Sequence, residues 1–182
     1  MEIPVYLFTG FLESGKTKFI QETLTDKRFN DGKGTILVLQ CEEGEEELDP
    51  SKFVSSKVAI ETIDSLDSLN KFELASLQKK HKAKKIVVEY NGMWQLNDFF
   101  EAMPNGWIIY QEMTFADSTT IMTYNANMRN LVVDRFNNCD AVVFNRFADN
   151  MDKMDYHKLV RGVSRGAAII YDYPDGRVEM DD

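Results

Sequence analysis

The sequence predicts an α/β fold in which a mostly parallel central sheet carries helices on both faces. Short runs rich in Val, Ile, Tyr and Phe alternate with longer amphipathic stretches, which is the order of βα units. Several of these runs, such as 86–88 and 141–144, are apolar at consecutive positions, as strands covered on both faces are. The 182 residues, 43% of them hydrophobic, suffice for one core of ordinary size. We therefore expect a single domain over residues 1–182.

Each element follows from its local pattern. Strands are expected at residues 5–9, 36–39, 58–63, 86–89, 108–116, 141–144 and 168–171, and helices at 16–25, 66–81, 94–103, 121–136 and 154–165. In the second helix, Leu66, Leu69, Phe72 and Leu77 form an apolar stripe that predicts packing against the sheet. Loops are expected at 30–34, 42–50, 104–106 and 174–176, where glycine, proline and acidic residues gather.

Charge and cysteine content exclude several classes of function. The chain has 21 basic and 30 acidic side chains, a net charge of −9 that repels phosphate backbones and anionic lipid, so neither nucleic acid nor a membrane is expected as a partner. The two cysteines, Cys41 and Cys139, form no disulfide framework. The N-terminus lacks the basic start of a secretory signal. These observations favour a cytoplasmic protein.

A phosphate-binding motif lies at residues 10–17. The sequence Gly10-Phe11-Leu12-Glu13-Ser14-Gly15-Lys16-Thr17 fits the Walker A pattern G-x-x-x-x-G-K-[ST], directly after a predicted strand and before a predicted helix. In such a loop the backbone N–H groups surround a phosphate, the lysine contacts the β and γ oxygens, and the hydroxyl ligates Mg²⁺. The residues expected to bind nucleotide here are Gly10, Glu13, Ser14, Gly15, Lys16 and Thr17.

Two acidic segments are candidates for the metal and catalytic side of the site. The strand at 86–89 ends in Glu89, at the edge where parallel sheets hold ligands, although an ordinary acid at a strand end is the alternative. The acidic loop, residues 42–49, has six carboxylates in eight positions, and simple solvation is its alternative. We expect Thr17, Glu42 and Glu89 to hold Mg²⁺, and Lys16 and Glu89 to act in catalysis.

A candidate base-reading loop follows the strand at 141–144. It reads Asn145-Arg146-Phe147-Ala148-Asp149, whereas guanine-binding proteins usually have Asn-Lys-x-Asp, so the acid stands one residue late. Asn145 is expected to contact the base and Arg146 to stack on it. A structural cap formed by Asn145 is the alternative.

Together these segments resemble the CobW/HypB/UreG family of P-loop GTPases, most closely the nucleotide-binding domain of the CobW-like branch. The resemblance runs over nearly the whole chain and rests on residues 4–12 and the phosphate loop, on Glu42, Gly44, Asp49, Glu89, Gly92, Asp117 and Asn145, and on the stretch 160–170. It implies a P-loop NTPase fold, GTP as ligand and substrate, Mg²⁺ as cofactor, and a role in metal handling or cofactor-protein maturation with a client metalloprotein. A nucleotide-dependent homodimer follows by the same analogy.

The sequence departs from that family in three places. The branch normally has a Cys-x-Cys-Cys motif before the position of Glu89, but no cysteine occurs from residue 42 to 138. Cys41 stands where the family usually has Asn, and Ala148 where it has the guanine-reading Asp. The chain also ends soon after its last predicted strand, as a short form or as the N-terminal part of a longer protein would.

The sequence therefore predicts a Mg²⁺-dependent protein that binds and slowly hydrolyses GTP. Slow turnover is expected because no arginine is evidently placed to stabilise the transition state. One alternative is a nucleotide-responsive binding module with little catalysis. The other is an ATP-using P-loop kinase or ATPase, although kinases gather arginines in a lid and here Arg129, Arg135, Arg161 and Arg165 are spread along helical stretches.

Overall fold

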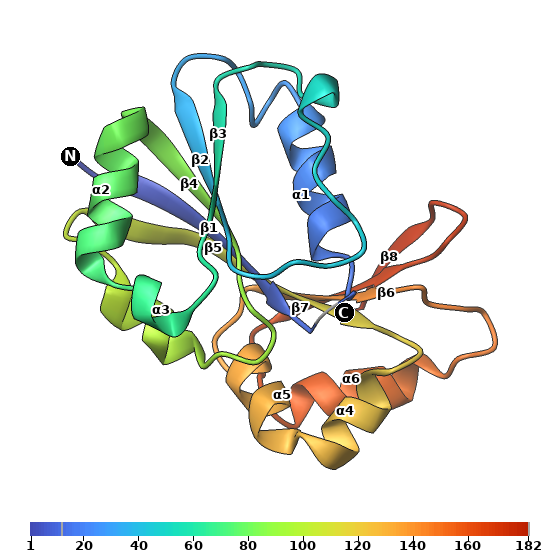
Figure 1. The fold of residues 1–182 in the computed structure, drawn as a ribbon. Helices are drawn as coiled ribbons and strands as arrows, with labels where there is room; N and C mark the ends of the chain where they lie inside the picture. The colour runs from blue at the N-terminus through green and yellow to red at the C-terminus, as the bar shows by residue number, and fades with distance from the viewer. Residues whose placement is uncertain (12, 182) are drawn as a thin grey trace.

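The computed structural model describes residues 1–11 and 13–181 as one eight-stranded sheet with helices packed against it (Figure 1). The strands are β1 (Ile3–Gly10), β2 (Thr35–Gln40), β3 (Val58–Thr62), β4 (Ala83–Glu89), β5 (Trp107–Asp117), β6 (Ala141–Asn145), β7 (Ala168–Asp172) and β8 (Val178–Asp181). The helices are α1 (Lys16–Thr25), α2 (Lys71–His81), α3 (Leu96–Ala102), α4 (Ile121–Asn127), α5 (Arg129–Phe136) and α6 (Lys153–Arg161), with 3₁₀ turns η1 (Pro50–Lys52) and η2 (Leu66–Ser68).

The strand order in the sheet is β3-β2-β4-β1-β5-β6-β7-β8. All neighbours are parallel except β7 and β8, which form an antiparallel hairpin. The predicted α/β class with a mostly parallel sheet is confirmed. Because the strands β1, β4, β5 and β6 run parallel, their carboxyl ends gather at one edge of the sheet, and the loops that follow them surround a common site.

Helices cover the two faces of the sheet unequally. On one face, Val88 of β4 packs in a cluster with side chains of α2 and α3, and Phe144 of β6 packs in a cluster with side chains of α5 and α6. On the other face, Val87 and Val143 lie in a cluster whose helical members come from α1. Consecutive apolar residues in β4 and β6 therefore reflect burial on both faces, as the sequence predicted. Over β6 to β8, no described helix lies on the α1 face.

Several predicted boundaries were wrong. The helix predicted at 121–136 is two helices, because Met128 has a non-helical backbone (φ −134°, ψ 49°) in an asparagine-rich stretch. The helix predicted at 66–81 is η2 followed by α2, since the side chain of Asn70 caps a new start at the N–H of Glu73. The predicted apolar stripe is also wrong in part, because Phe72 is 77% exposed while Leu74 is buried.

Other differences concern length and the end of the chain. The helix predicted to extend to 165 ends at Arg161, and the helix predicted at 94–103 spans Leu96–Ala102. Strand β4 begins at Ala83, three residues before its apolar run, because Ala83 and Lys85 already pair with Thr35 and Ile36 of β2. Strand β8 was not predicted. The proline-glycine loop at 174–176 is the turn of the β7–β8 hairpin.

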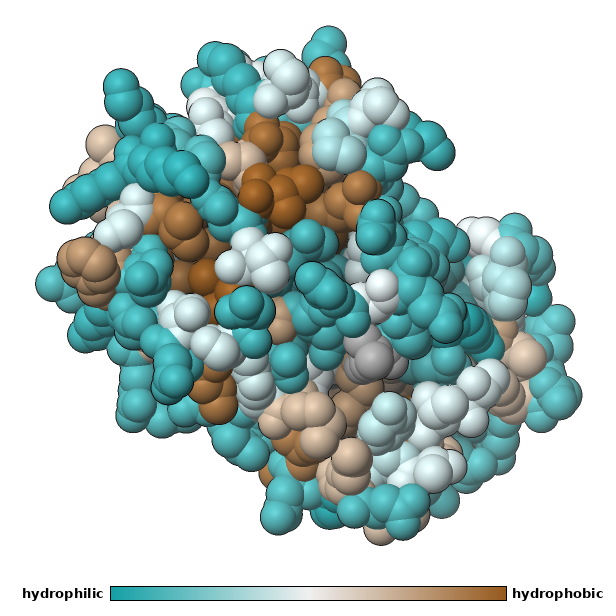
Figure 2. All heavy atoms as spheres, viewed as in Figure 1, coloured by the Kyte–Doolittle hydropathy of each residue, from teal (hydrophilic) through white to brown (hydrophobic). Residues whose placement is uncertain are grey.

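The edge strand β3 is only partly covered. Apolar side chains of Phe53, Val58 and Ile60 are partly buried against the cluster beneath α1. Figure 2 shows hydrophobic surface between β3 and α1 on this face of the molecule. The carboxyl edge of the sheet, in contrast, carries the polar residues that form the site.

Candidate functional site

The phosphate loop connects β1 to α1 in the way that its sequence predicted. Gly15 caps α1 with φ +99°, and a Cβ atom there would lie 2.1 Å from Nδ2 of Asn145. Gly10 has φ +132°, and its Cβ would lie 2.1 Å from the carbonyl oxygen of Phe115. Both glycines of the motif are therefore required by backbone conformation and by close packing. Leu12 of the motif lies outside the described residues.

Lys16 is buried within this loop. Its side chain is 3% exposed and donates hydrogen bonds to the carbonyl oxygens of Gly10 and Phe11, each at 3.0 Å. Its ammonium also forms an ion pair with Glu42, at 2.7 Å from Nζ to Oε1. Burial lowers the pKa of Lys16, and the neighbouring Glu42 carboxylate opposes that shift. The arrangement holds a cation at the start of α1, where the helix dipole also favours anions.

Glu42 joins three loops through one carboxylate. Its Oε1 contacts Lys16 of the phosphate loop, and its Oε2 accepts a hydrogen bond from the backbone N–H of Gly92 at 2.7 Å. The sequence predicted that Glu42 would hold a metal together with Thr17 and Glu89. In the structure its carboxylate contacts Lys16 and Gly92, and the metal role of Glu42 stays a prediction.

Thr17 and Glu89 meet at the ends of two elements. The hydroxyl of Thr17 donates to Oε2 of Glu89 at 2.6 Å, because β4 is the parallel neighbour of β1 and the phosphate loop follows β1. Glu89 is 2% exposed, and burial raises its pKa although the hydrogen bond from Thr17 opposes the shift. A hydroxyl and a carboxylate in contact are hard oxygen donors, which fit Mg²⁺ completed by phosphate and water oxygens. The two side chains therefore suit the predicted cofactor.

The next question is whether protein side chains alone could form a metal site. Among residues 1–11 and 13–181, no group of three or more His, Cys, Asp or Glu side chains is arranged to hold a metal ion. Cys41 and Cys139 are buried, and burial raises the pKa of both thiols, that of Cys139 to about 12. The backbone N–H of Cys41 donates to the carbonyl of Glu89 at 2.9 Å. This contact places Cys41 beside the end of β4, directly before the acidic loop.

The predicted base-reading residues lie next to the phosphate loop. The amide of Asn145 donates to the carbonyl of Ser14 at 2.5 Å, so this side chain supports the loop. Arg146 has a left-handed backbone (φ 56°) and donates to the carbonyl of Glu13 at 3.1 Å and to Asp117 at 2.5 Å. Burial opposes ionisation of Asp117, but hydrogen bonds from Thr119 and Arg146 hold its pKa below the ordinary value.

The surface around these residues forms two adjoining hollows. The first is lined by the predicted phosphate-binding residues Glu13 to Thr17 together with Glu42 and Glu89. The second, of about 270 Å³, extends along α1 toward the ends of β6 and β7. Both hollows include Gly15, Glu46 and Arg146 in their walls. The second hollow therefore continues from the phosphate loop toward the candidate base-reading loop.

Sequence reasoning missed Arg135. Its side chain is fully buried, and its guanidinium donates to the carbonyls of Asn91, at 3.0 Å, and Trp94, and to Asp134. Arg135 therefore anchors the segment that follows Glu89 to helix α5. Arg135 lies beside Phe136 in the sequence, and an arginine that is buried with such a neighbour must find hydrogen-bond acceptors. The partners themselves depend on the tertiary fold.

Solved structures with the same fold were found by comparison of the coordinates. A Zn(II)-bound YjiA GTPase from E. coli superimposes with a TM-score of 0.64 at 16% identity, covering 98% of this chain and 60% of that chain. The hydrogenase maturation factor HypB from Archaeoglobus fulgidus gives 0.64 at 14% identity, covering 96% of this chain and 82% of that one. This chain therefore shares the α/β fold of these two proteins. It spans about 60% of the length of the YjiA chain that it matches.

The comparisons confirm, at the level of the fold, the resemblance that the motifs of the sequence indicated. No protein-family model matches the sequence. No curated protein matches it either. Within the part of the chain that the structure describes, no helix is long and apolar enough to cross a membrane.

Proposed function

We propose that this protein binds GTP together with Mg²⁺ and hydrolyses it slowly. One observation carries the proposal: the buried ammonium of Lys16 and the Thr17–Glu89 pair lie side by side at the start of α1. A triphosphate needs a cation, a metal-binding hydroxyl and free backbone N–H groups at the same place. The YjiA GTPase supports the nucleotide class, since it shares this fold.

Each group has a definite task in that reaction. The N–H groups at Glu13 and Gly15 would contact the β-phosphate, and Lys16 would neutralise charge that moves onto the β and γ oxygens. Thr17 and Glu89 would hold the metal ion, which supplies charge stabilisation of the phosphates when it is bound. Glu89 would also accept a hydrogen bond from the attacking water, which is the catalytic role expected for it from the sequence.

The first experiment is titration of the protein with fluorescent GTP and ATP analogues in the presence of Mg²⁺, followed by measurement of phosphate release. Lys16→Ala should abolish binding, and Glu89→Gln should retain binding while phosphate release slows by about 100-fold. Lys27→Ala removes an exposed lysine just beyond the C-terminal end of α1 and serves as the matched control. Equal binding by the wild-type protein and Lys16→Ala would refute the proposal.

A second candidate function is a nucleotide-responsive binding module. The contacts of Glu42 favour it, because one carboxylate ties the acidic loop to both Lys16 and Gly92. Phosphate groups would compete with Glu42 for Lys16, and release of Glu42 would free the acidic loop to change its position. Binding without measurable phosphate release would support this function over hydrolysis.

We also infer a wider role from the two neighbours, of which one is Zn(II)-bound and the other is a hydrogenase maturation factor. In this role the nucleotide cycle serves metal handling or maturation of a client metalloprotein, and the protein forms a nucleotide-dependent homodimer in the cytoplasm. The inference rests on likeness of fold alone. Sedimentation of the protein with and without a non-hydrolysable GTP analogue tests the dimer, and a monomer under both conditions would contradict it.

A further inference from the structure

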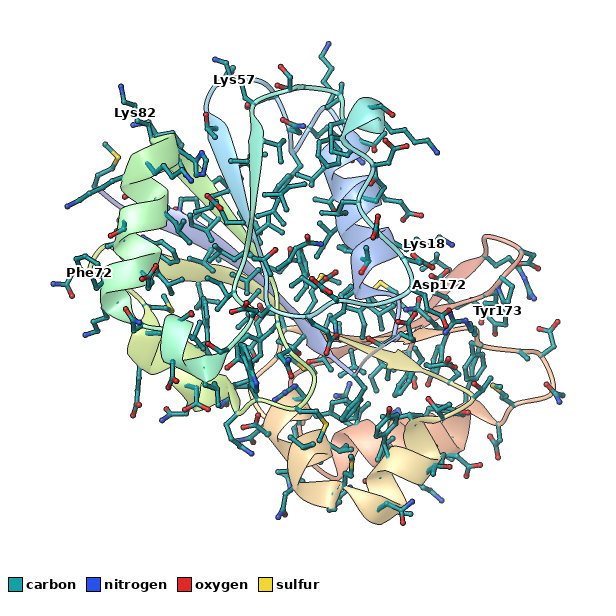
Figure 3. The ribbon with its side chains drawn as sticks, viewed as in Figure 1. Lys18, Lys57, Phe72, Lys82, Asp172 and Tyr173 are labelled. Carbon is teal, nitrogen blue, oxygen red and sulfur yellow. The ribbon has the colours of Figure 1, made fainter. Side chains whose placement is uncertain are left out.

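The hollow beside α1 holds a carboxylate to which the guanine motif does not assign a role. Its walls include Lys18 and Phe19 of α1, Val143 and Asn145 of β6, and Asp172 and Tyr173 at the end of β7. Figure 3 shows Lys18, Asp172 and Tyr173 on the same side of α1, toward β6 to β8. The hollow adjoins the phosphate site through Gly15 and Arg146, so it lies where the nucleoside of a bound triphosphate would be.

The position of Asp172 follows from the pleat of β7. Ile169 and Tyr171 point into the cluster under α5 and α6, whereas Ala168 and Ile170 pack against the cluster under α1. Because side chains alternate along a strand, Asp172 belongs to the α1 face, which is the face of the hollow. Among the described residues, the Asp172 carboxylate forms no hydrogen bond or ion pair. Its acceptor oxygens are therefore available to a ligand.

Asp172 also stands next to the base loop. Strands β6 and β7 pair in parallel up to Phe144 and Tyr171, so the residues that follow, Asn145 and Asp172, end neighbouring strands. The N–H of Phe147 donates to the carbonyl of Asp172 at 3.1 Å, which fixes the backbone of Asp172 to the base loop. This contact gives the carboxylate a defined place at the edge of the site.

The residue expected to read guanine from the motif lies elsewhere. Ala148 has no acceptor, and Asp149, one position later, is 78% exposed and ion-paired with Arg177 of the β7–β8 hairpin. The side-chain amide of Asn145 already donates a hydrogen bond to the carbonyl of Ser14. The other acids in the hollow, Glu22 on α1 and Glu46 in the acidic loop, are exposed and do not stand at a strand end.

We propose that Asp172 is the specificity-determining residue that selects guanine, in place of the aspartate missing at position 148. Guanine presents two donors side by side, N1–H and the exocyclic amino group at C2, and a carboxylate accepts from both. Adenine presents an acceptor at N1, which a carboxylate repels. The ammonium of Lys18, in the wall of the same hollow, is a donor suited to the guanine O6. This assignment rests on the proposed function and deepens it.

Competition for a fluorescent GTP analogue tests the assignment, with GTP, xanthosine triphosphate, inosine triphosphate and ATP as competitors. The wild-type protein should prefer GTP to ATP, and inosine triphosphate, which lacks the amino group at C2, should bind about tenfold more weakly than GTP. Asp172→Asn should lose GTP affinity by roughly 10- to 100-fold. It should gain affinity for xanthosine triphosphate, because the asparagine amide donates to the carbonyl at C2 of xanthine.

Two matched controls remove other carboxylates near the site. Asp149→Asn tests the acid that the motif suggests, and Glu22→Gln tests an acid in the same hollow; both should keep the GTP preference of the wild type. A gain of xanthosine triphosphate binding by Asp172→Asn also shows that the variant is folded. If the wild type binds GTP and Asp172→Asn leaves both affinities unchanged, the assignment of Asp172 is wrong while the proposed function stands. If the wild type binds no triphosphate, the proposed function fails, and this assignment fails with it.

Discussion

Glu112 is a carboxyl group buried within the sheet, and replacing it with glutamine is expected to stabilise the protein at alkaline pH. Glu112 is 5% exposed, and its Oε2 has no hydrogen-bond partner among the described residues. Its backbone N–H donates to the carboxylate of Asp140 at 2.8 Å, so a second negative charge lies close by. Burial, and then the charges of Asp140 and Asp134, raise the pKa of Glu112 to about 7.

The sign and size of the effect follow from this shift. Between the ordinary value of 4.5 and about 7, the folded protein binds a proton on Glu112 that the unfolded chain has released. The stabilising contribution is complete below pH 4.5 and is lost as the pH rises to about 7. A shift of this size corresponds to about 3 kcal/mol of folding free energy. Glutamine keeps the shape without ionising, so Glu112→Gln should remove that loss.

Urea denaturation at pH values from 5 to 8 measures the difference directly. The free energy of unfolding of Glu112→Gln, minus that of the wild type, should rise by about 2.5 kcal/mol between pH 5 and 8, because part of the loss already occurs below pH 5. Glu47→Gln, at an exposed position in the acidic loop, is the control and should show no such rise. A difference between Glu112→Gln and the wild type that stays constant over this range would refute the reasoning.

Two further predictions concern the groups around the phosphate loop. Glu42→Gln removes the carboxylate that competes with phosphate for Lys16. The affinity for Mg²⁺-nucleotide should therefore rise about tenfold in a fluorescence titration. A fall in affinity would instead assign Glu42 to the metal. Arg135→Met removes the cation that holds the carbonyls of Asn91 and Trp94, and should lower the free energy of unfolding by about 3 to 5 kcal/mol in urea. Arg129→Met, on the exposed surface of the same helix, should change it by less than about 0.5 kcal/mol, and equal effects would contradict the anchoring role.

The parts of the fold that could be predicted are those in which local pattern and burial agree. The apolar run at 86–88 and the glycines of the phosphate loop identify a buried strand and a tight turn without reference to distant residues. Strand β8 has no such signal, because Val178 and Met180 are exposed and alternate with acids that face other side chains. It exists because β7 offers a free edge, which is a property of the assembled sheet.

Some residues of the candidate site could likewise be predicted from local sequence, and others could not. Lys16, Thr17 and Glu89 are found from motif and strand position, and the structure brings them together. The contact between Glu42 and Gly92 spans 50 residues and depends on how two loops meet, so spacing alone could not reveal it. Asp172 carries no motif at all. Its relation to the base loop follows only from the pairing of β6 with β7.

The two buried cysteines can serve as probes of local opening in this protein. A thiol that is out of contact with solvent and has a raised pKa reacts with alkylating reagents only while the structure around it is open. Cys41 lies between β2 and the acidic loop, and Cys139 lies just before β6, so each reports on a different part of the sheet. Their separate alkylation rates would distinguish an opening confined to the nucleotide loops from one that involves the whole domain.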